Sequence, residues 1–299
     1  MSTEADSRSR LVAMLALVGV TAIWGSTFVV VKDAVDKMPV LDFLAWRFGI
    51  ATIALMLVRP RALRGLGRDG WRAGLILGLA LGLGYIAQTQ GLKTTPASIS
   101  GFITGMFVVF TPLVAGLVLH RRVGGWAWLA VALATVGLGL ISLRGASTGT
   151  GELLTLACAA CFAIHIVGLG EWSPSYDAGG LAILQLGTVA VICAIAAAPS
   201  SLAPPPDADV WAAVLLTGLA ASAVGFLVQT WAQSHLAPVR TAVVLTMEPV
   251  FAGIFGVLVD GDDLGARIIA GAICVIAAML VVEAGPRRGA EGDVERLEV

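Results

Sequence analysis

Long apolar runs dominate the chain, and short clusters of charged residues, proline and glycine separate them. A helix needs about 20 apolar residues to cross a bilayer, and ten runs are long enough to be candidates. They cover residues 11–31, 40–58, 73–92, 98–119, 126–143, 152–170, 179–197, 210–233, 240–259 and 266–284. The pattern predicts an all-α integral membrane protein with ten transmembrane helices joined by short loops.

The composition agrees with this pattern. Of the 299 residues, 58% are hydrophobic and only 13% are charged. A soluble domain cannot cover its surface with so few charges, so lipid must solvate much of the chain. The first apolar run, residues 11–31, is too long for the apolar region of a secretory signal and is expected to remain as the first helix. The net charge of −1 argues against nucleic acid as a partner.

Basic residues predict the orientation, because loops rich in lysine and arginine stay on the cytoplasmic side. Apart from Arg47, which lies inside a run, thirteen basic residues fall on the side of the N-terminus and five on the other. The five are Lys32, Lys37, Lys93, Arg144 and Arg267. We therefore expect a multi-pass protein of the plasma membrane (the cell inner membrane in a bacterium), with cytoplasmic tails at residues 1–10 and 286–299.

Two stretches of the chain resemble two later ones. The run Tyr85–Thr89 matches Phe226–Thr230 at an offset of 141 residues. Further on, Thr111–Gly116 matches Glu248–Gly253 at an offset of 137 residues. The matches predict two five-helix repeats that differ slightly in loop length.

The predicted repeats cover residues 11–145 and 150–285. Five is an odd number of helices, so the two copies must cross the membrane in opposite senses. Loop charge supports the inversion: His120–Arg121–Arg122 is basic, whereas the corresponding loop Asp260–Asp263 is acidic. Inverted repeats place substrate sites at their interface near the bilayer midplane.

Four short motifs carry a resemblance to a known family. Trp24–Val29 reads W-G-S-T-F-V, Arg47–Phe48 reads R-F, Glu248–Ala252 reads E-P-V-F-A and Gly261–Leu264 reads G-D-D-L. Together with ten spans in two repeats, they are similar to the EamA-type family of the drug/metabolite transporter superfamily. The chain departs from the family pattern at Asp262, where glutamate is usual, and in lacking this ending in its first half.

The resemblance implies a secondary, non-ATP transporter of a small metabolite, in particular an exporter of amino acids or related compounds. Its cavity would lie between the two repeats, which would give alternating access to the two sides of the membrane. Two other classes stay open: a membrane-embedded enzyme acting on a lipid-linked substrate, and a channel. The short loops weigh against the enzyme.

Charged residues within the runs are candidates for the site, because a charge at mid-bilayer needs a partner or a water-filled cavity. Arg47 and Glu248 lie nearest the centres of their runs. They are expected either to pair with each other or to have separate roles, Arg47 in structure or gating and Glu248 in binding substrate or a coupling proton. Pro112 and Pro249 occupy matching positions and free backbone carbonyls, which suits a structural or gating role.

Aromatic and polar side chains at similar depth predict a pocket for a partly apolar metabolite. Trp24, Tyr85, His165 and Phe226 lie near the midplane, and packing between helices is the alternative interpretation. Gln88 and Gln229 lie towards opposite helix ends, where they suit gates as well as binding. The predicted substrate-binding residues are Trp24, Thr27, Tyr85, Gln88, His165, Gln185, Phe226, Gln229 and Glu248.

No motif predicts a cofactor or a bound metal. Cys158 and Cys161 form a C-x-x-C pair, but with no second pair it reads as helix packing. Walker-type and H-E-x-x-H sequences are absent, which excludes ATP-driven pumping within this chain and a zinc protease of that type. The expected partners are a small-molecule substrate, the lipid bilayer and a coupling proton. Substrate identity and oligomeric state are not readable.

Overall fold

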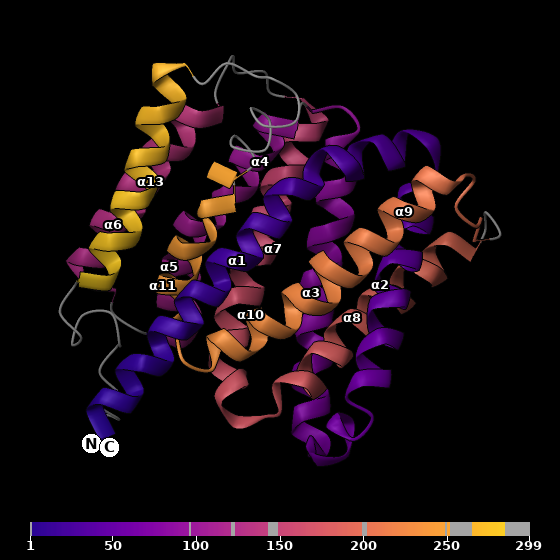
Figure 1. Ribbon diagram of the computed structural model, residues 1–299, viewed down its shortest axis with the longest axis horizontal. Helices are drawn as coiled ribbons and strands as arrows, with labels where there is room; N and C mark the ends of the chain where they lie inside the picture. The colour runs from indigo at the N-terminus through magenta and orange to yellow at the C-terminus, as the bar shows by residue number, and fades with distance from the viewer. Residues whose placement is uncertain are drawn as a thin grey trace.

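The computed structural model describes residues 2–95, 97–120, 123–142, 149–198, 202–248, 250–251 and 265–284, and these contain helices and no strands. Figure 1 shows the helices side by side in one bundle. They are α1 (Ser2–Lys37), α2 (Val40–Val58), η1 (Ala62–Gly65), α3 (Gly67–Leu92), α4 (Ala97–Gly105), α5 (Phe107–Leu119), α6 (Gly125–Ser142), α7 (Thr150–Trp172), η2 (Ser173–Ser175), α8 (Ala178–Ala197), α9 (Ala208–Leu216), η4 (Thr217–Val224), α10 (Gly225–Gln233), α11 (Pro238–Leu245) and α13 (Ala266–Ala284).

Six helical segments in the described part of the chain are long and apolar enough to cross a membrane. They are Arg8–Lys37, Val40–Val58, Gly67–Leu92, Thr150–Ser175, Ala178–Ala197 and Ala208–Gln233. Three shorter apolar helices are Ile103–Leu119, Gly125–Leu140 and Ile269–Val281. Part of the expected span 240–259 lies outside the described residues, and Pro249 is among the residues that the structure does not describe. The all-helical membrane class is therefore confirmed, and the count of ten spans stays a prediction.

The surface of the bundle is apolar where a soluble protein would be polar. Leu57 and Leu117 are 77% and 78% exposed, and many other large apolar side chains are exposed with them. Polar side chains such as Arg47, His165 and Gln185 are instead buried. This inside-out distribution fits a lipid environment around a polar interior.

Local sequence explains where several helices begin. The Asp177 carboxylate accepts a hydrogen bond from the Gly180 backbone N–H at 2.8 Å and caps α8. Asp207 caps α9 in the same way, through the Val210 backbone N–H at 2.9 Å. Each cap satisfies a backbone donor that the helix itself leaves unpaired.

Several expected spans are interrupted rather than continuous, and the fourth and the eighth show it most clearly. The fourth divides at Met106 into α4 and α5, six residues before Pro112, which lies inside α5. The eighth divides into α9, the π-helix η4 and α10. Pro112 leaves the Val108 carbonyl without its helical partner, two residues after the first of these interruptions. π-Helices are rare and occur often at functional sites, so the second points to the η4 region as a place to look for one.

Close packing between α3 and α8 depends on glycine. A Cβ atom on Gly78 would lie 2.5 Å from the Thr188 Cβ and 2.8 Å from the Gln185 carbonyl oxygen. A Cβ on Gly82 would come no closer than 3.5 Å to Val189. The missing side chain of Gly78 therefore lets α3 approach α8 closely, as small residues do between membrane helices.

We expect Gly78→Ala to destabilise the protein by about 1–3 kcal/mol, because the added methyl group forces two helices apart. Gly82→Ala is the matched control, since its methyl group meets only ordinary contacts. Thermal unfolding of both variants in detergent tests this expectation. Equal melting temperatures for the two would contradict the packing described here.

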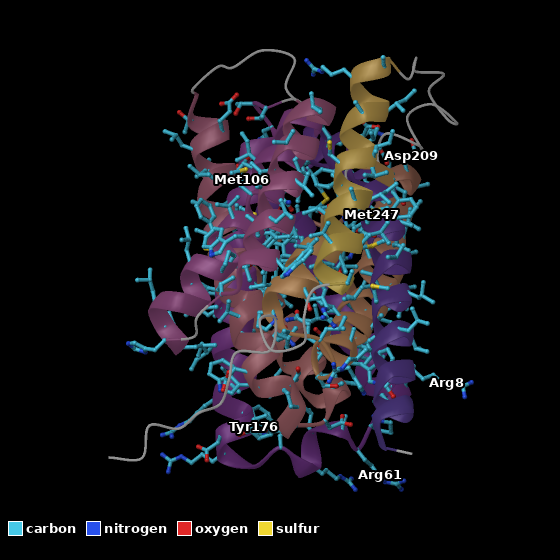
Figure 2. The ribbon with its side chains drawn as sticks, turned by 90° about the vertical axis from the view of Figure 1, so that its left-hand side faces the viewer. Arg8, Arg61, Met106, Tyr176, Asp209 and Met247 are labelled. Atoms are coloured by element: carbon cyan, nitrogen blue, oxygen red, sulfur yellow. The ribbon has the colours of Figure 1, made fainter. Side chains whose placement is uncertain are left out.

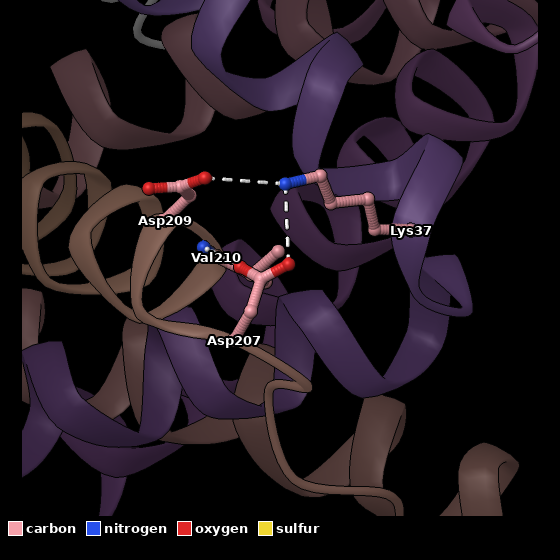
Figure 3. Close-up of polar contacts among 4 residues, drawn as sticks. All are labelled: Lys37, Asp207, Asp209 and Val210. Carbon is pink, nitrogen blue, oxygen red and sulfur yellow. Dashed lines mark hydrogen bonds and ion pairs between the residues drawn. The ribbon is translucent and has the colours of Figure 1, made fainter.

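Ion pairs connect the two halves of the chain at both ends of α2. At one end the Lys37 Nζ lies 3.1 Å from the Asp207 Oδ2 and 3.4 Å from the Asp209 Oδ2, as Figure 3 shows. At the other end the Arg59 Nη2 lies 3.0 Å from the Asp177 Oδ2. Such exposed pairs add little stability. Each pair joins the first half of the chain to the second, so its distance changes in any motion that separates the halves at that end.

The Asp207 carboxylate gives one of these ends a predictable response to acid. The Val210 backbone N–H and then Lys37 lower the pKa of Asp207. A depressed carboxyl pKa stabilises the fold above the ordinary value, and this contribution is lost as the pH falls through the lowered value. Melting temperatures should therefore fall more steeply below about pH 4 in the wild type than in Asp207→Asn. Parallel curves of melting temperature against pH would contradict this expectation. Asp209→Asn is the control, because Asp209 also pairs with Lys37 but does not cap α9.

Candidate functional site

A cavity lies between the two halves of the chain. Eight of the nine predicted substrate-binding residues line it, and so does Arg47. The eight are Trp24, Thr27, Tyr85, Gln88, His165, Phe226, Gln229 and Glu248. The first four come from α1 and α3, and the others from α7, α10 and the segment after α11. A concave site lined by aromatic rings and a few polar groups suits a small molecule.

The ninth predicted residue, Gln185, is not among the residues that line this cavity. Its side chain is completely buried on α8, and its Oε1 lies 2.5 Å from the His165 Nε2. The Gln185 Nε2 donates to the Thr230 Oγ1 at 3.4 Å, and the Thr230 hydroxyl donates to the Phe226 carbonyl. The Gln185 Oε1 must then accept a hydrogen bond from His165, so this series of hydrogen bonds fixes the imidazole proton on Nε2.

Aromatic rings from both halves meet at the cavity. The ring centroids of Trp24 and Phe226 lie 5.4 Å apart, and those of Tyr85 and Phe226 lie 6.0 Å apart. Tyr85 also packs against Phe162 at 5.3 Å, edge to face. Such contacts hold the rings in place and give the cavity a largely apolar wall.

Trp24 is anchored by the π-helical segment of the other half. Its indole N–H donates to the Ala221 carbonyl oxygen at 2.7 Å, and Ala221 lies within η4. A Cβ on Gly225 would lie 2.8 Å from the Trp24 Nε1, so the indole reaches the backbone only because residue 225 is glycine. The π-helix thus has a definite contact with a cavity residue.

Arg47 is held by neutral groups rather than by an acid. Its Nε donates to the Ser222 Oγ at 2.8 Å, and its Cζ lies 4.9 Å from the Tyr85 ring centroid and 5.1 Å from that of Phe48. Within the described part of the chain, Arg47 and Glu248 form no direct ion pair, although both line the cavity. Cation–π contacts and the serine therefore stabilise the buried guanidinium.

Sequence reasoning missed several residues of this region. Ser222 carried no signal beyond being a hydroxyl within a span, and its partner became visible only in three dimensions. Asp42, which does not line the cavity, was also missed: its carboxylate is buried in the first turn of α2 and has no hydrogen-bond partner among the described residues. Thr104 lines the cavity and accepts a hydrogen bond from the Gln88 Nε2 at 3.1 Å.

The described residues contain no cluster of three or more His, Cys, Asp or Glu side chains that could hold a metal ion. Cys158 and Cys161 lie on α7 as free thiols. The polar groups that line the cavity are one acid, one guanidinium, an imidazole, two amides and the hydroxyls of three threonines and a tyrosine, and aromatic faces surround them. These groups suit reversible binding of a small polar molecule with an apolar part.

The chain is similar to proteins named as transporters. It is 33% identical over 285 residues to an uncharacterized transporter of Archaeoglobus fulgidus, which covers 93% of this chain and 88% of the relative. It is 25% identical to YedA, an uncharacterized inner membrane transporter of Escherichia coli, over 89% of each chain. One solved protein structure matches with a TM-score of 0.74 at 16% identity, over 90% of this chain and 95% of the other, which shows a shared fold.

The model of the EamA-like transporter family matches residues 11–143 and 149–283, nearly the whole chain. The motifs at Trp24–Val29, Arg47–Phe48 and Glu248–Ala252 fall within these two matches. The protein is therefore a membrane protein and belongs to the EamA-like transporter family.

Proposed function

We propose that this membrane transporter is a secondary exporter of amino acids or related small metabolites, working by alternating access between two inverted repeats. The observation that carries the proposal is the shared cavity. Trp24, Arg47 and Tyr85 from the first half face His165, Phe226 and Glu248 from the second across one space. A site built from both halves opens to either side when one half rocks against the other.

The repeat organisation rests on several observations. The family match has two segments, and these nearly coincide with the proposed repeats 11–145 and 150–285. Corresponding helices also pack together, α2 against α8 and α6 against α13. Figure 1 shows the second of these pairs at one edge of the bundle. Equivalent helices meeting across an interface are expected when two copies are related by a pseudo-twofold axis.

The charges of the cavity favour a molecule with an apolar body and both an acidic and a basic group. Arg47 supplies a guanidinium for an anion, and Glu248 supplies a carboxylate for a cation. The apolar rings between them suit an aliphatic or aromatic side chain. An amino acid zwitterion has all three features.

The proposed orientation places both termini in the cytoplasm. Figure 2 shows Arg8 and Arg61 at one end of the bundle and Asp209 at the other, as that topology requires. In a variant without native cysteines, Arg64→Cys should be protected from an impermeant thiol reagent in intact cells, and Pro206→Cys should react. Both side chains are exposed in the structure, so access depends on the side of the membrane. The opposite labelling pattern would refute the orientation.

A ligand screen tests the proposed substrate class. The full chain in detergent should be stabilised against heat by at least one apolar amino acid. Arg47, Glu248 and the aromatic wall give this binding its basis. If only compounds without an amino acid group stabilise the protein, the substrate class proposed here is wrong.

A further inference from the structure

Gln229 lines the cavity, and its hydrogen bond with Gln233 fixes which way its side-chain amide points. Gln233 Nε2 donates to the Ile166 carbonyl oxygen at 2.8 Å, and this oxygen only accepts. Gln233 must therefore turn its Oε1 towards Gln229, whose Nε2 donates to it at 3.1 Å. The remaining polar atom of this pair is the Gln229 Oε1, and it is an acceptor.

That acceptor is unsatisfied. Gln229 is 2% exposed, and its Oε1 has no hydrogen-bond partner among the described residues. A buried polar atom without a partner destabilises the fold, so its presence in a cavity wall calls for an explanation. A ligand that donates a hydrogen bond would supply one.

A second acceptor lines the same cavity. Glu248 makes no hydrogen bond or direct ion pair with the described residues, and Arg47 is held by Ser222, Tyr85 and Phe48 instead. The second half of the chain thus contributes two acceptor groups, Gln229 and Glu248, and no donor that pairs with them. The cationic group of the cavity, Arg47, belongs to the first half.

Building on the proposed function, we propose that Gln229 and Glu248 form an amine subsite, which binds the ammonium group of the substrate. The Gln229 Oε1 accepts a hydrogen bond from the ammonium, and the Glu248 carboxylate balances its charge. A substrate carboxylate then faces the Arg47 side of the cavity. The substrate is thereby oriented, with its amine towards the second repeat and its acid towards the first.

The inference predicts a difference among three molecules that share one apolar body. L-leucine has both charged groups, 3-methylbutylamine has only the amine, and 4-methylpentanoate has only the acid. Gln229→Leu should weaken binding of L-leucine and of 3-methylbutylamine on the order of tenfold, the cost of a lost hydrogen bond to a charged group. It should leave binding of 4-methylpentanoate nearly unchanged.

Isothermal titration of the purified full chain measures these affinities. Gln88→Leu is the matched control, because Gln88 also lines the cavity but its amide donates to Thr104. This control should not discriminate between the amine and the acid. Should Gln229→Leu fail to fold, Glu248→Gln gives the same comparison with little change in shape.

Three results would overturn the amine subsite. One is an equal loss of affinity for all three probes in Gln229→Leu, and another is no loss for either amine. The third is a wild-type protein that binds 4-methylpentanoate but neither amine. The first two results, with a wild type that still binds L-leucine, refute the subsite and leave the proposed function standing, whereas the third also contradicts the proposed substrate class.

Discussion

Replacing Glu248 with glutamine should lower transport at least about tenfold, or remove its dependence on pH, while the protein remains folded and inserted. Glutamine keeps the shape and one acceptor oxygen but carries no charge and binds no proton at neutral pH. A hydrogen bond to a charged group contributes about 1.5–3 kcal/mol, which corresponds to this loss. Transport by proteoliposomes containing the variant, measured across a range of pH, tests the expectation.

The alternative for Glu248 is a structural pairing with Arg47. That alternative predicts a loss of stability in Glu248→Gln and partial rescue when Arg47→Gln is added, because the second change removes an orphaned charge. The contacts of Arg47 with Ser222 and Tyr85 favour the functional role instead. A stable Glu248→Gln protein with unchanged transport at every pH would refute that role.

Replacing Trp24 with alanine should weaken substrate binding by at least about tenfold, equivalent to about 1.4 kcal/mol. The indole forms part of the cavity wall, packs against Phe226 and donates to the Ala221 carbonyl. Trp24→Phe should retain more affinity, because it keeps a ring and loses only the N–H group. Titration with the best ligand from the thermal screen measures both effects.

Trp126→Ala is the control for loss of a large aromatic side chain. Trp126 is 50% exposed at the start of α6, far along the chain from the cavity residues, and it does not line the cavity. Its removal should leave the affinity unchanged. If Trp24→Ala and Trp126→Ala weaken binding equally, Trp24 has no special place in the site.

The sequence predicted the helical membrane fold and nine of the nineteen residues that line the cavity, because both depend on simple patterns. Apolar runs of bilayer length predict spans, and paired positions in two repeats predict which side chains share a depth. Trp24, Tyr85, His165 and Phe226 were found in this way and line one cavity. The depth of a side chain in the membrane follows from its position along the span, which can be counted in the sequence.

The sequence did not predict in which direction each side chain points from its helix, and therefore which partner it contacts. Gln185 has the right depth, but it faces His165 behind the cavity wall rather than the space itself. Arg47 has an obvious acidic candidate in Glu248, yet the structure pairs it with Ser222. The rotation of each helix and the π-helical register of η4 decide these partners, and no local pattern specifies either.

The most direct test of the central claim, that the cavity between the halves carries substrate across the membrane, is a counterflow assay. Proteoliposomes are loaded with the unlabelled compound that stabilises the protein best and receive a trace of the labelled compound outside, without ATP. We predict transient accumulation of label with the wild type, little with Trp24→Ala and none with empty liposomes. Accumulation by Trp24→Ala equal to that of the wild type, or no accumulation of a bound compound by the wild type, would contradict the claim.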